Sequence, residues 1–295
     1  MKRHAQFLIG IGCALLSAGA VLAQTYPSKA IRMVMPFPPG GPTDIVGRLV
    51  AQKLSDQIGQ PVVADSRPGA SGNVGLEIAS KAPADGYTIV LSSPVIALSP
   101  LLYGKLNYDP WKDLAPIALV GAVRNVLVVH PSVPANTVPE FVAWLKKENG
   151  KASFASSGTG QSPHLSGAWF LQLTGTKAEH IPYRGAAPAL NDLIAGVTQF
   201  FFDNLTSSIE FVRAGKLRAL GITSAQRNPL TPDLVPICET MPELKPFDVS
   251  TWFGVFLPAA APKPVLDAYN GEIKTWLDDA KTKERFAQMA GFPAY

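Results

Sequence analysis

Cysteine is nearly absent from this chain. Only Cys13 and Cys238 occur in 295 residues, and Cys13 lies in an N-terminal apolar segment that we expect to be removed. One remaining cysteine excludes an intramolecular disulfide in the mature protein. Fold stability must therefore come from a packed core, which a content of 47% hydrophobic and 16% charged residues can supply.

The chain also lacks the short motifs of common catalytic sites. It contains no G-x-S-x-G, S-x-x-K, H-E-x-x-H or G-x-x-x-x-G-K-[ST] motif and no cluster of metal ligands. Beyond the N-terminal segment only His130, His164 and His180 occur, and no nucleophile is evident beside His164, which we expect to brace a loop by a hydrogen bond. We predict no catalytic residue, no metal site and no cofactor. A secreted α/β enzyme that acts on a small carboxylic acid or ester remains the alternative.

Runs of basic residues are missing as well. The formal net charge of the whole chain is +4, and the Lys and Arg residues are scattered without an interleaved aromatic patch. Binding to nucleic acid is therefore not expected. The length suits one large or two medium domains.

Only one long apolar run is present, and it lies at the N-terminus. Lys2 and Arg3 precede an uncharged run over residues 7–22, and the small residue Ala23 follows. This pattern is typical of a secretory signal peptide at residues 1–23. A membrane anchor is the alternative, but the run is short for a span. We expect cleavage after Ala23, export to the periplasm, and no other segment that crosses a bilayer.

Residues 31–48 combine a strand, a rigid loop and a helix start. The apolar run 31–35 predicts a buried strand, and the loop PFPPGGPTD at 36–44 ends it because proline has no N–H for the ladder. Thr43 and Asp44 are helix-capping types, and helical apolar spacing follows them. The start of a helix has unpaired N–H groups and a partial positive charge, so this loop could hold a carboxylate.

A second segment has the same organisation in different residues. From Lys151 the pattern predicts a strand, then the loop SSGTGQS at 156–162, then an amphipathic helix. The loop offers hydroxyl and N–H donors to an anion. Each loop alone could be an ordinary connection. Two such loops about 120 residues apart favour two jaws on either side of one ligand.

Alternating strand and helix patterns predict a parallel sheet in each half of the chain, with ligand groups at the carboxyl ends of the strands. After a turn-rich connection at 108–111, residues 126–130 form an apolar run that ends at a proline, and 252–257 form a similar run. They predict two strands that cross between domains as a hinge. The predicted domains are a first α/β lobe at 24–123 and 250–295 and a second α/β lobe at 124–249.

Nine motifs occur in register between about Tyr26 and Tyr295: PFPPGGPTD at 36–44, RPGASGNVG at 67–75, ADGYT at 84–88, NYDPWKDLAPI at 107–117, SSGTGQSPHL at 156–165, PYRG at 182–185, FDN at 202–204, GKLRALGIT at 215–223 and STWFGVFLPA at 250–259. Together they resemble the extracytoplasmic solute receptors of tripartite tricarboxylate transporters, often called Bug receptors. Pro42 departs from the common pattern because it stands where glycine is frequent.

The resemblance implies a type II periplasmic-binding-protein fold. It also implies that two α/β lobes joined by a two-strand hinge close on a small organic carboxylate, held by main-chain N–H groups of both loops. The expected partners are that ligand and the membrane permease subunits of a tripartite tricarboxylate transporter, with the receptor itself a monomer. A ligand-binding component of a sensor pathway is the alternative to transport.

The two loops and the polar groups at the other strand ends make up the candidate ligand-binding set. Its members are Phe37, Pro38, Gly40, Gly41, Thr43, Asp44, Ser92, Ser157, Gly158, Thr159, Gly160, Gln161, His164, Tyr183, Asp203 and Asn204. Asp44 would carry a negative charge beside an anion. We therefore expect it to cap the first turn of the helix and to meet a ligand only through water or a ligand donor.

Overall fold

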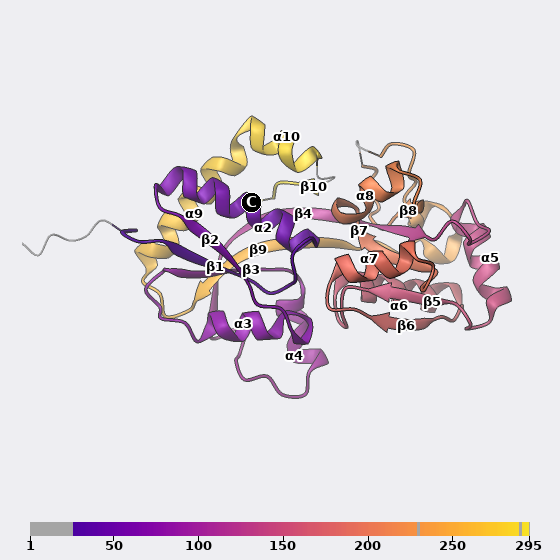
Figure 1. Ribbon diagram of the computed structural model, residues 1–295, viewed down its shortest axis with the longest axis horizontal. Helices are drawn as coiled ribbons and strands as arrows, with labels where there is room; N and C mark the ends of the chain where they lie inside the picture. Colours follow the sequence, from indigo (N-terminus) through magenta and orange to yellow (C-terminus); the bar gives the residue numbers. More distant parts are fainter. Residues whose placement is uncertain (1–25, 229–230, 289–290, 295) are drawn as a thin grey trace, which may run out of the picture.

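The computed structural model describes residues 26–228, 231–288 and 291–294, so the expected signal peptide and Cys13 lie outside the described residues. Figure 1 shows two α/β lobes side by side along the long axis, with β4 (Leu114–Val129) and β9 (Ser250–Pro258) running through the centre. In the described part of the chain, no helix combines the length and the apolar character that crossing a bilayer requires.

The first lobe is a sheet with helices on both faces. Its elements are β1 Ile31–Met35, α2 Pro42–Ile58, β2 Val62–Ser66, η1 Ala70–Gly72, α3 Asn73–Ser80, β3 Thr88–Ser92, α4 Val95–Leu102, α9 Lys263–Asp278, α10 Ala280–Gln288 and β10 Gly291–Phe292. The strand order is β2-β1-β3-β9-β4, with β1 parallel to β2 and β3. Four of the five β1 residues are buried, as expected for a parallel strand that is covered on both faces.

Separate cores lie on the two faces of this sheet. Val46, Val50 and Leu54 of α2 pack with residues of α9 on one face. Leu76 and Ala79 of α3 pack with residues of α4 on the other face. The predicted parallel pairing is confirmed for β1, β2 and β3, and helices cover both faces. The sheet as a whole is mixed, because β9 is antiparallel to β3 and to β4.

The second lobe repeats this arrangement. Its elements are α5 Val138–Glu148, β5 Ser153–Ser156, α6 Ser162–Thr174, β6 Glu179–Pro182, α7 Ala186–Ile194, β7 Phe200–Asn204, α8 Leu205–Arg213, β8 Arg218–Ile222, η2 Ile237–Glu239 and η3 Pro242–Leu244. β5 is parallel to β6 and β7, while β7 and β8 are antiparallel to β4. A core rich in phenylalanine fills the side under α5 and α6, and a second core fills the side under α7 and α8.

The strand β4 is longer than the sequence predicts. The apolar run at 126–130 marks only its end, because β4 begins at Leu114. Residues 114–124 pair with β9, and residues 125–129 pair with β7 and β8, so one strand belongs to both sheets. Its register with β9 shifts near Pro116 and again near Gly121. Proline and glycine are unfavourable inside regular strands, which is why the pattern obscured this segment.

The helix α2 begins earlier than its capping residues predict. Gly41 is the N-cap and Pro42 is the first helical residue, which places Thr43 and Asp44 inside the first turn. Proline is well suited to that position because the first helical N–H has no partner in the helix. The prediction that Thr43 or Asp44 would be the N-cap is therefore wrong.

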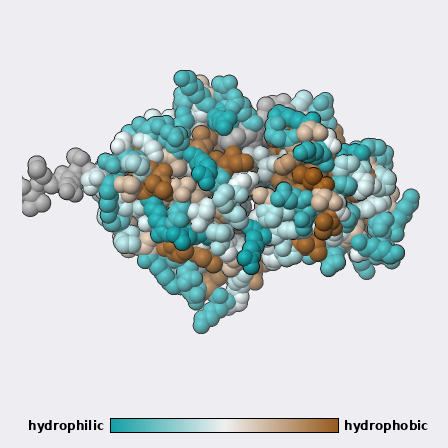
Figure 2. Space-filling view, viewed as in Figure 1, coloured by the Kyte–Doolittle hydropathy of each residue, from teal (hydrophilic) through white to brown (hydrophobic). Residues whose placement is uncertain are grey.

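The surface in the same view is mostly hydrophilic. Figure 2 shows teal residues over most of the outline, with brown hydrophobic residues in separate groups over both lobes. This distribution fits amphipathic helices that turn their apolar sides toward the sheets and their polar sides outward.

Candidate functional site

Two adjoining cavities lie where the lobes meet. Both are lined by Phe37 and Pro38 from the loop after β1 and by Ser157 from the loop after β5. The inner cavity has a volume of about 20 Å³, enough for a group the size of one water molecule. The outer cavity has a volume of about 460 Å³, within the range of small-molecule sites. The loops predicted as two jaws therefore face each other across one site.

Several helices begin at the inner cavity. Gly41, Gln161, Gly185 and Asn204 line it, and they are the N-caps of α2, α6, α7 and α8. Ser93, which also lines it, precedes the N-cap of α4. None of these five N-caps has a side-chain capping hydrogen bond. Four helix N-caps therefore line one small volume, and the partial positive charge of helix starts favours an anion there.

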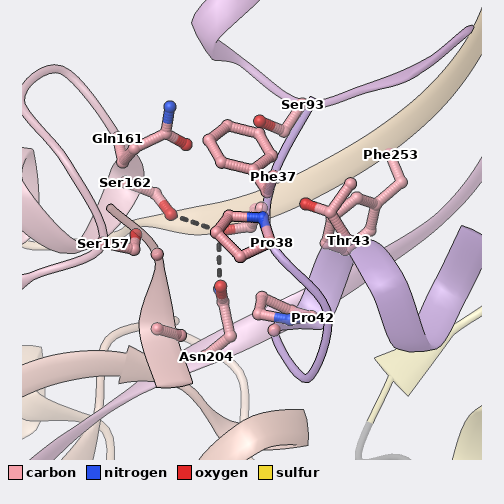
Figure 3. Close-up of a pocket in the computed structure, with 14 residues that line it drawn as sticks. Phe37, Pro38, Pro42, Thr43, Ser93, Ser157, Gln161, Ser162, Asn204 and Phe253 are labelled. Carbon is pink, nitrogen blue, oxygen red and sulfur yellow. Dashed lines mark hydrogen bonds between the residues drawn. The ribbon is translucent and has the colours of Figure 1, made fainter. Parts of the chain in front are cut away.

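Three hydroxyl groups of the inner cavity are available to a ligand. The Thr43, Ser93 and Ser157 side chains make no hydrogen bond within the described residues, and the buried Ser93 Oγ has no partner there. Figure 3 shows these three side chains around the cavity together with Phe37 and Pro38. None of the lining residues is acidic. The cavity thus offers donors without a competing negative charge.

A buried polar network lies beneath the inner cavity. The Asn204 amide donates to Thr251 Oγ1 at 2.8 Å and to Asn125 Oδ1 at 2.5 Å. Thr251 Oγ1 also donates to Asn125 Oδ1 at 3.1 Å and is hydrogen-bonded to Ser162 Oγ. The dashed lines in Figure 3 join Ser162 and Asn204 to this threonine hydroxyl. The network connects β4, α6, β7 and β9 and so holds the starts of α6 and α8 in place.

The outer cavity is bounded by the loop between β2 and α3 and by the loops after β5 and β6. Ala70 and Ser71 have φ values of +45° and +54°, which are unusual for residues other than glycine. The Gln161 side-chain amide donates to the Ser71 carbonyl at 3.0 Å and so links the two lobes. Gly158 has φ +137°, and a Cβ there would lie 3.0 Å from Ser71 Oγ, so the close approach of these loops favours glycine.

Ten of the sixteen candidate residues line these cavities. Phe37, Pro38, Gly41, Thr43, Ser157, Gln161 and Asn204 line the inner cavity, and Gly158, Thr159 and Tyr183 line the outer one, which Phe37, Pro38 and Ser157 also reach. The other six, Gly40, Asp44, Ser92, Gly160, His164 and Asp203, line neither.

Asp44 and Gly40 bond to each other. The Gly40 N–H donates to Asp44 Oδ2 at 3.1 Å, and Asp44 Oδ1 accepts from Arg48 Nε at 2.9 Å. The carboxylate therefore turns back to the loop and to Arg48, and the expected capping of the first turn is wrong. Because the Gly40 N–H donates to Asp44, it is not available to a ligand.

Gly160 and His164 form a similar internal pair. The Gly160 N–H donates to His164 Nδ1 at 3.1 Å, which confirms the predicted bracing role of this histidine. The His164 ring stacks on His180 with centroids 4.1 Å apart, and burial lowers the pKa of both imidazoles, that of His180 to about 4. Both histidines are thus neutral near neutral pH.

Ser92 and Asp203 line neither cavity, whereas the residue that follows each of them, Ser93 and Asn204, lines the inner one. Successive residues of an extended chain point in opposite directions, which accounts for the difference. Ser92 is fully buried and its hydroxyl donates to the Ser93 carbonyl at 3.4 Å. Asp203 is also fully buried. Its Oδ2 accepts from Ser207 Oγ at 2.6 Å, its Oδ1 has no partner among the described residues, and burial raises its pKa to about 7.

Sequence reasoning missed several lining residues. Arg184 and Gly185 belong to the PYRG motif, from which only Tyr183 was selected, and Ala186 follows that motif. Ser93 directly follows the selected Ser92. The remaining missed residues are Pro42, Ser162, Thr251 and Phe253 in the inner cavity and Pro68, Gly69, Ala70, Ser71, Gly72 and Pro182 in the outer one.

The side chains at the site do not form a metal centre. Among residues 26–228, 231–288 and 291–294, no three His, Cys, Asp or Glu side chains are grouped so that they could hold a metal ion. Two α/β lobes that share strands and enclose a small donor-rich cavity define a solute-binding protein of the periplasmic-binding-protein type. A sequence profile described as tripartite tricarboxylate transporter family receptor matches residues 46–291. The chain belongs to this receptor family.

Individual relatives agree with this assignment. Protein BugT of Bordetella pertussis is 37% identical over 295 residues, which cover 98% of this chain and 89% of BugT. The solved structure of R. palustris Rpa4515 with adipate has a TM-score of 0.89 and 32% identity, and the match covers 91% of this chain and 89% of that one. The structure of periplasmic binding protein BugD has a TM-score of 0.86 and 34% identity, with the same coverage. The predicted type II periplasmic-binding-protein fold and the resemblance to Bug receptors are confirmed.

Proposed function

We propose that this protein is exported to the periplasm, binds a small organic carboxylate between its lobes, and delivers it to the membrane subunits of a tripartite tricarboxylate transporter. The observation that carries the proposal is the inner cavity, which four helix N-caps and the Ser93 hydroxyl line without an acidic side chain, and that hydroxyl has no partner among the described residues. A carboxylate is an anion small enough to place its oxygens there. The related Rpa4515 structure holds adipate, which is a carboxylate.

The same proposal includes the division into lobes. Residues 24–123 and 250–295 would form one lobe and residues 124–249 the other, with closure around the crossing segments of β4 and β9. We also expect the protein to work as a monomer. Light scattering of the purified protein, with and without ligand, measures the oligomeric state.

Binding without turnover is part of the proposal. In the described part of the chain, serine and histidine meet as Ser156 Oγ and His180 Nε2 at 2.6 Å and as Ser132 Oγ and His130 Nδ1 at 2.7 Å, and neither His130 nor Ser132 lines a cavity. Ser156 is fully buried and lines neither cavity, and the low pKa of His180 makes it a weak base. Mass analysis after prolonged incubation should return the ligand unchanged. Conversion in proportion to protein would favour the enzyme alternative instead.

Ser93→Ala tests the inner cavity. Because the Ser93 hydroxyl is buried without a partner, removing it should leave the melting temperature of the ligand-free protein unchanged or slightly higher. The affinity for a carboxylate should fall about fivefold to tenfold, equivalent to about 1 to 1.4 kcal/mol, because one donor to the anion is lost. Isothermal titration calorimetry with the best ligand from a thermal-shift screen of small carboxylates, adipate included, measures this.

Ser99→Ala is the matched control. Ser99 is a fully buried serine of α4 that lines neither cavity, so its replacement should leave the affinity unchanged. The neutral amide of the same ligand should bind far more weakly, since the helix starts favour a negative charge. Equal affinity for acid and amide, or for Ser93→Ala and the unmodified protein, would contradict the proposed site.

A further inference from the structure

Three stacked rings lie beside the loop that joins β5 to α6. They belong to Phe154 of β5, His180 of β6 and His164 of α6. The ring centroids of Phe154 and His180 are 4.9 Å apart, and those of His180 and His164 are 4.1 Å apart. None of the three residues lines either cavity. The loop beside them supplies four residues that do, namely Ser157, Gly158, Thr159 and Gln161.

Each histidine of this ring column holds one part of the loop. The Gly160 N–H donates to His164 Nδ1 at 3.1 Å. His180 Nε2 is hydrogen-bonded to Ser156 Oγ at 2.6 Å, and the same hydroxyl oxygen accepts the Gly158 N–H at 3.2 Å. Gly158 and Gly160 have φ values of +137° and +82°, which other residues rarely adopt. The bonds to the two imidazoles therefore fix the loop where its backbone conformation is least common.

The bond to Gly160 requires a neutral imidazole. A ring nitrogen that accepts an N–H bond carries no hydrogen itself, so His164 must have its proton on Nε2. A second proton would place an N–H of His164 against the N–H of Gly160. Charging both rings of the column would also bring like charges together, because the two centroids are only 4.1 Å apart. The loop is thus held by an uncharged pair.

No charged side chain compensates a proton on either ring. In the described part of the chain neither imidazole takes part in an ion pair, and Phe154 and Ser156, which contact His180 from β5, are uncharged. Glu179 precedes His180 in β6, but it is exposed and points to the other side of the strand. Burial lowers the pKa of both imidazoles, and the neighbouring His164 lowers that of His180 further, to about 4.

We propose that His164 and His180 are positioning residues for the carboxylate: as a neutral stacked pair they hold the loop at 156–162 in its binding conformation, and a proton on the pair releases the loop and weakens binding. The inference rests on the proposed function, because Ser157 and Gln161 of this loop line the inner cavity. In the released loop an imidazole titrates near its ordinary pKa of about 6.5. Affinity should therefore fall in acid more steeply than protonation of the ligand alone explains.

Calorimetry at pH 7.5 and pH 4.5, with the best carboxylate from the thermal-shift screen, tests the inference. His164→Asn keeps an acceptor for the Gly160 N–H, because the side-chain oxygen of asparagine is bonded to Cγ as Nδ1 is, and it takes up no proton in this range. At pH 7.5 its affinity should stay within about threefold of that of the unmodified protein. From pH 7.5 to pH 4.5 the unmodified protein should lose at least about threefold more affinity than His164→Asn, since ligand protonation affects both alike.

Two further variants remove one bond each. His164→Leu leaves the buried Gly160 N–H without an acceptor, so its affinity at pH 7.5 should fall at least about tenfold. His180→Phe keeps a ring for stacking but removes the nitrogen beside Ser156 Oγ, so its affinity should fall at least about fivefold. Unchanged affinity in either variant would overturn the role of that histidine.

Nitrogen NMR of the imidazole rings measures the protonation state directly. In the ligand-bound protein at pH 7.5, His164 should carry its proton on Nε2. A proton on Nδ1 would overturn the inference. So would equal pH profiles for the unmodified protein and His164→Asn when both bind a carboxylate.

His130→Asn is the matched control. His130 Nδ1 also contacts a serine hydroxyl, that of Ser132, at 2.7 Å, but neither residue lines a cavity. Its replacement should keep the pH profile of the unmodified protein. Melting curves at both pH values restrict the comparison to folded protein. No binding of any carboxylate to the unmodified protein at pH 7.5 would overturn the proposed function, whereas binding with unchanged pH profiles would overturn this inference alone.

Discussion

Adjacent residues at the ends of β3 and β7 have opposite environments. Ser93 and Asn204 line the inner cavity, while Ser92 and Asp203 are buried on the other side of the same strand ends. Both members of each pair can form hydrogen bonds, so residue type alone does not show which of the two lines the cavity. Side chains of successive residues point in opposite directions, so a shift of one residue would exchange a ligand contact for a core contact.

Asp44 illustrates how a charged residue near an anion site can be structural. Its carboxylate holds the Gly40 N–H and Arg48, whose side chain is 58% exposed. An ion pair that is this exposed contributes at most about 1 kcal/mol. Asp44→Asn keeps an oxygen for the Gly40 N–H, so we expect the melting temperature to fall by no more than a few degrees and the carboxylate affinity to stay within about twofold.

Thermal melting and calorimetry measure both effects. Asp56→Asn, at an exposed position near the other end of α2, controls for the loss of a negative charge on that helix. A loss of affinity of tenfold or more in Asp44→Asn alone would show direct contact with a ligand donor, and would return Asp44 to the binding site.

At the scale of elements, the strands β4, β7 and β9 and the helix α6 meet at one threonine. The Thr251 hydroxyl is bonded to Asn125, Ser162 and Asn204, and each of these residues comes from a different element. Buried networks of this kind stabilise a structure only when every member has a partner. The position of the helix starts at the inner cavity therefore depends on Thr251.

Thr251→Val tests this dependence. Valine has nearly the same shape, so the change mainly leaves the amide groups of Asn125 and Asn204 short of a partner, at about 1 to 3 kcal/mol. We expect the melting temperature to fall by several degrees and carboxylate affinity to fall with it, because Asn204 marks the start of α8. Differential scanning calorimetry and ligand titration measure the two effects.

The chain offers a matched control for this substitution. Thr198 is also buried, but its Oγ1 has no partner among the described residues, so Thr198→Val should be neutral or stabilising. If both valine variants melted at the same temperature, the hydroxyl network would not be what holds these elements together.

At the scale of the whole molecule, the buried Asp203 and the half-buried His180 make stability depend on pH in opposite directions. Burial raises the pKa of Asp203 to about 7, so the folded state holds this proton more tightly and loses stability as pH rises from about 4 to 7. Burial lowers the pKa of His180 to about 4, so the folded state loses stability as pH falls from about 6.5 to 4.

Asp203→Asn separates the two contributions. It removes the buried negative charge, so the melting temperature at pH 8 should rise by several degrees above that of the unmodified protein, and the gain should vanish near pH 4, where Asp203 is protonated. Melting curves between pH 4 and 8 measure this. Asp267→Asn, at an exposed residue paired with Lys263, should show no such gain. A gain of equal size at pH 4 and pH 8 would assign the effect to packing.

The sequence by itself determined the local parts of this protein. The proline-rich and serine-rich loops, the strands before them and the helices after them follow from residue type and spacing over fewer than twenty residues, and they are present in the structure. The family resemblance rested on the same short motifs. Fold class and the two facing loops were therefore predictable.

Tertiary structure decided which groups meet. Thr251 and Asn125 are 126 residues apart and share a hydrogen bond, and Gln161 bonds to Ser71 across 90 residues. β4 could not be recognised in full because Pro116 and Gly121 interrupt its pattern, and only pairing with β9 makes it a strand. Strand register placed Ser93 and Asn204 at the inner cavity, and the packing of the loops placed Arg184 at the outer one. Strand register and loop packing both depend on residues that are distant in sequence, so local sequence patterns do not reveal them.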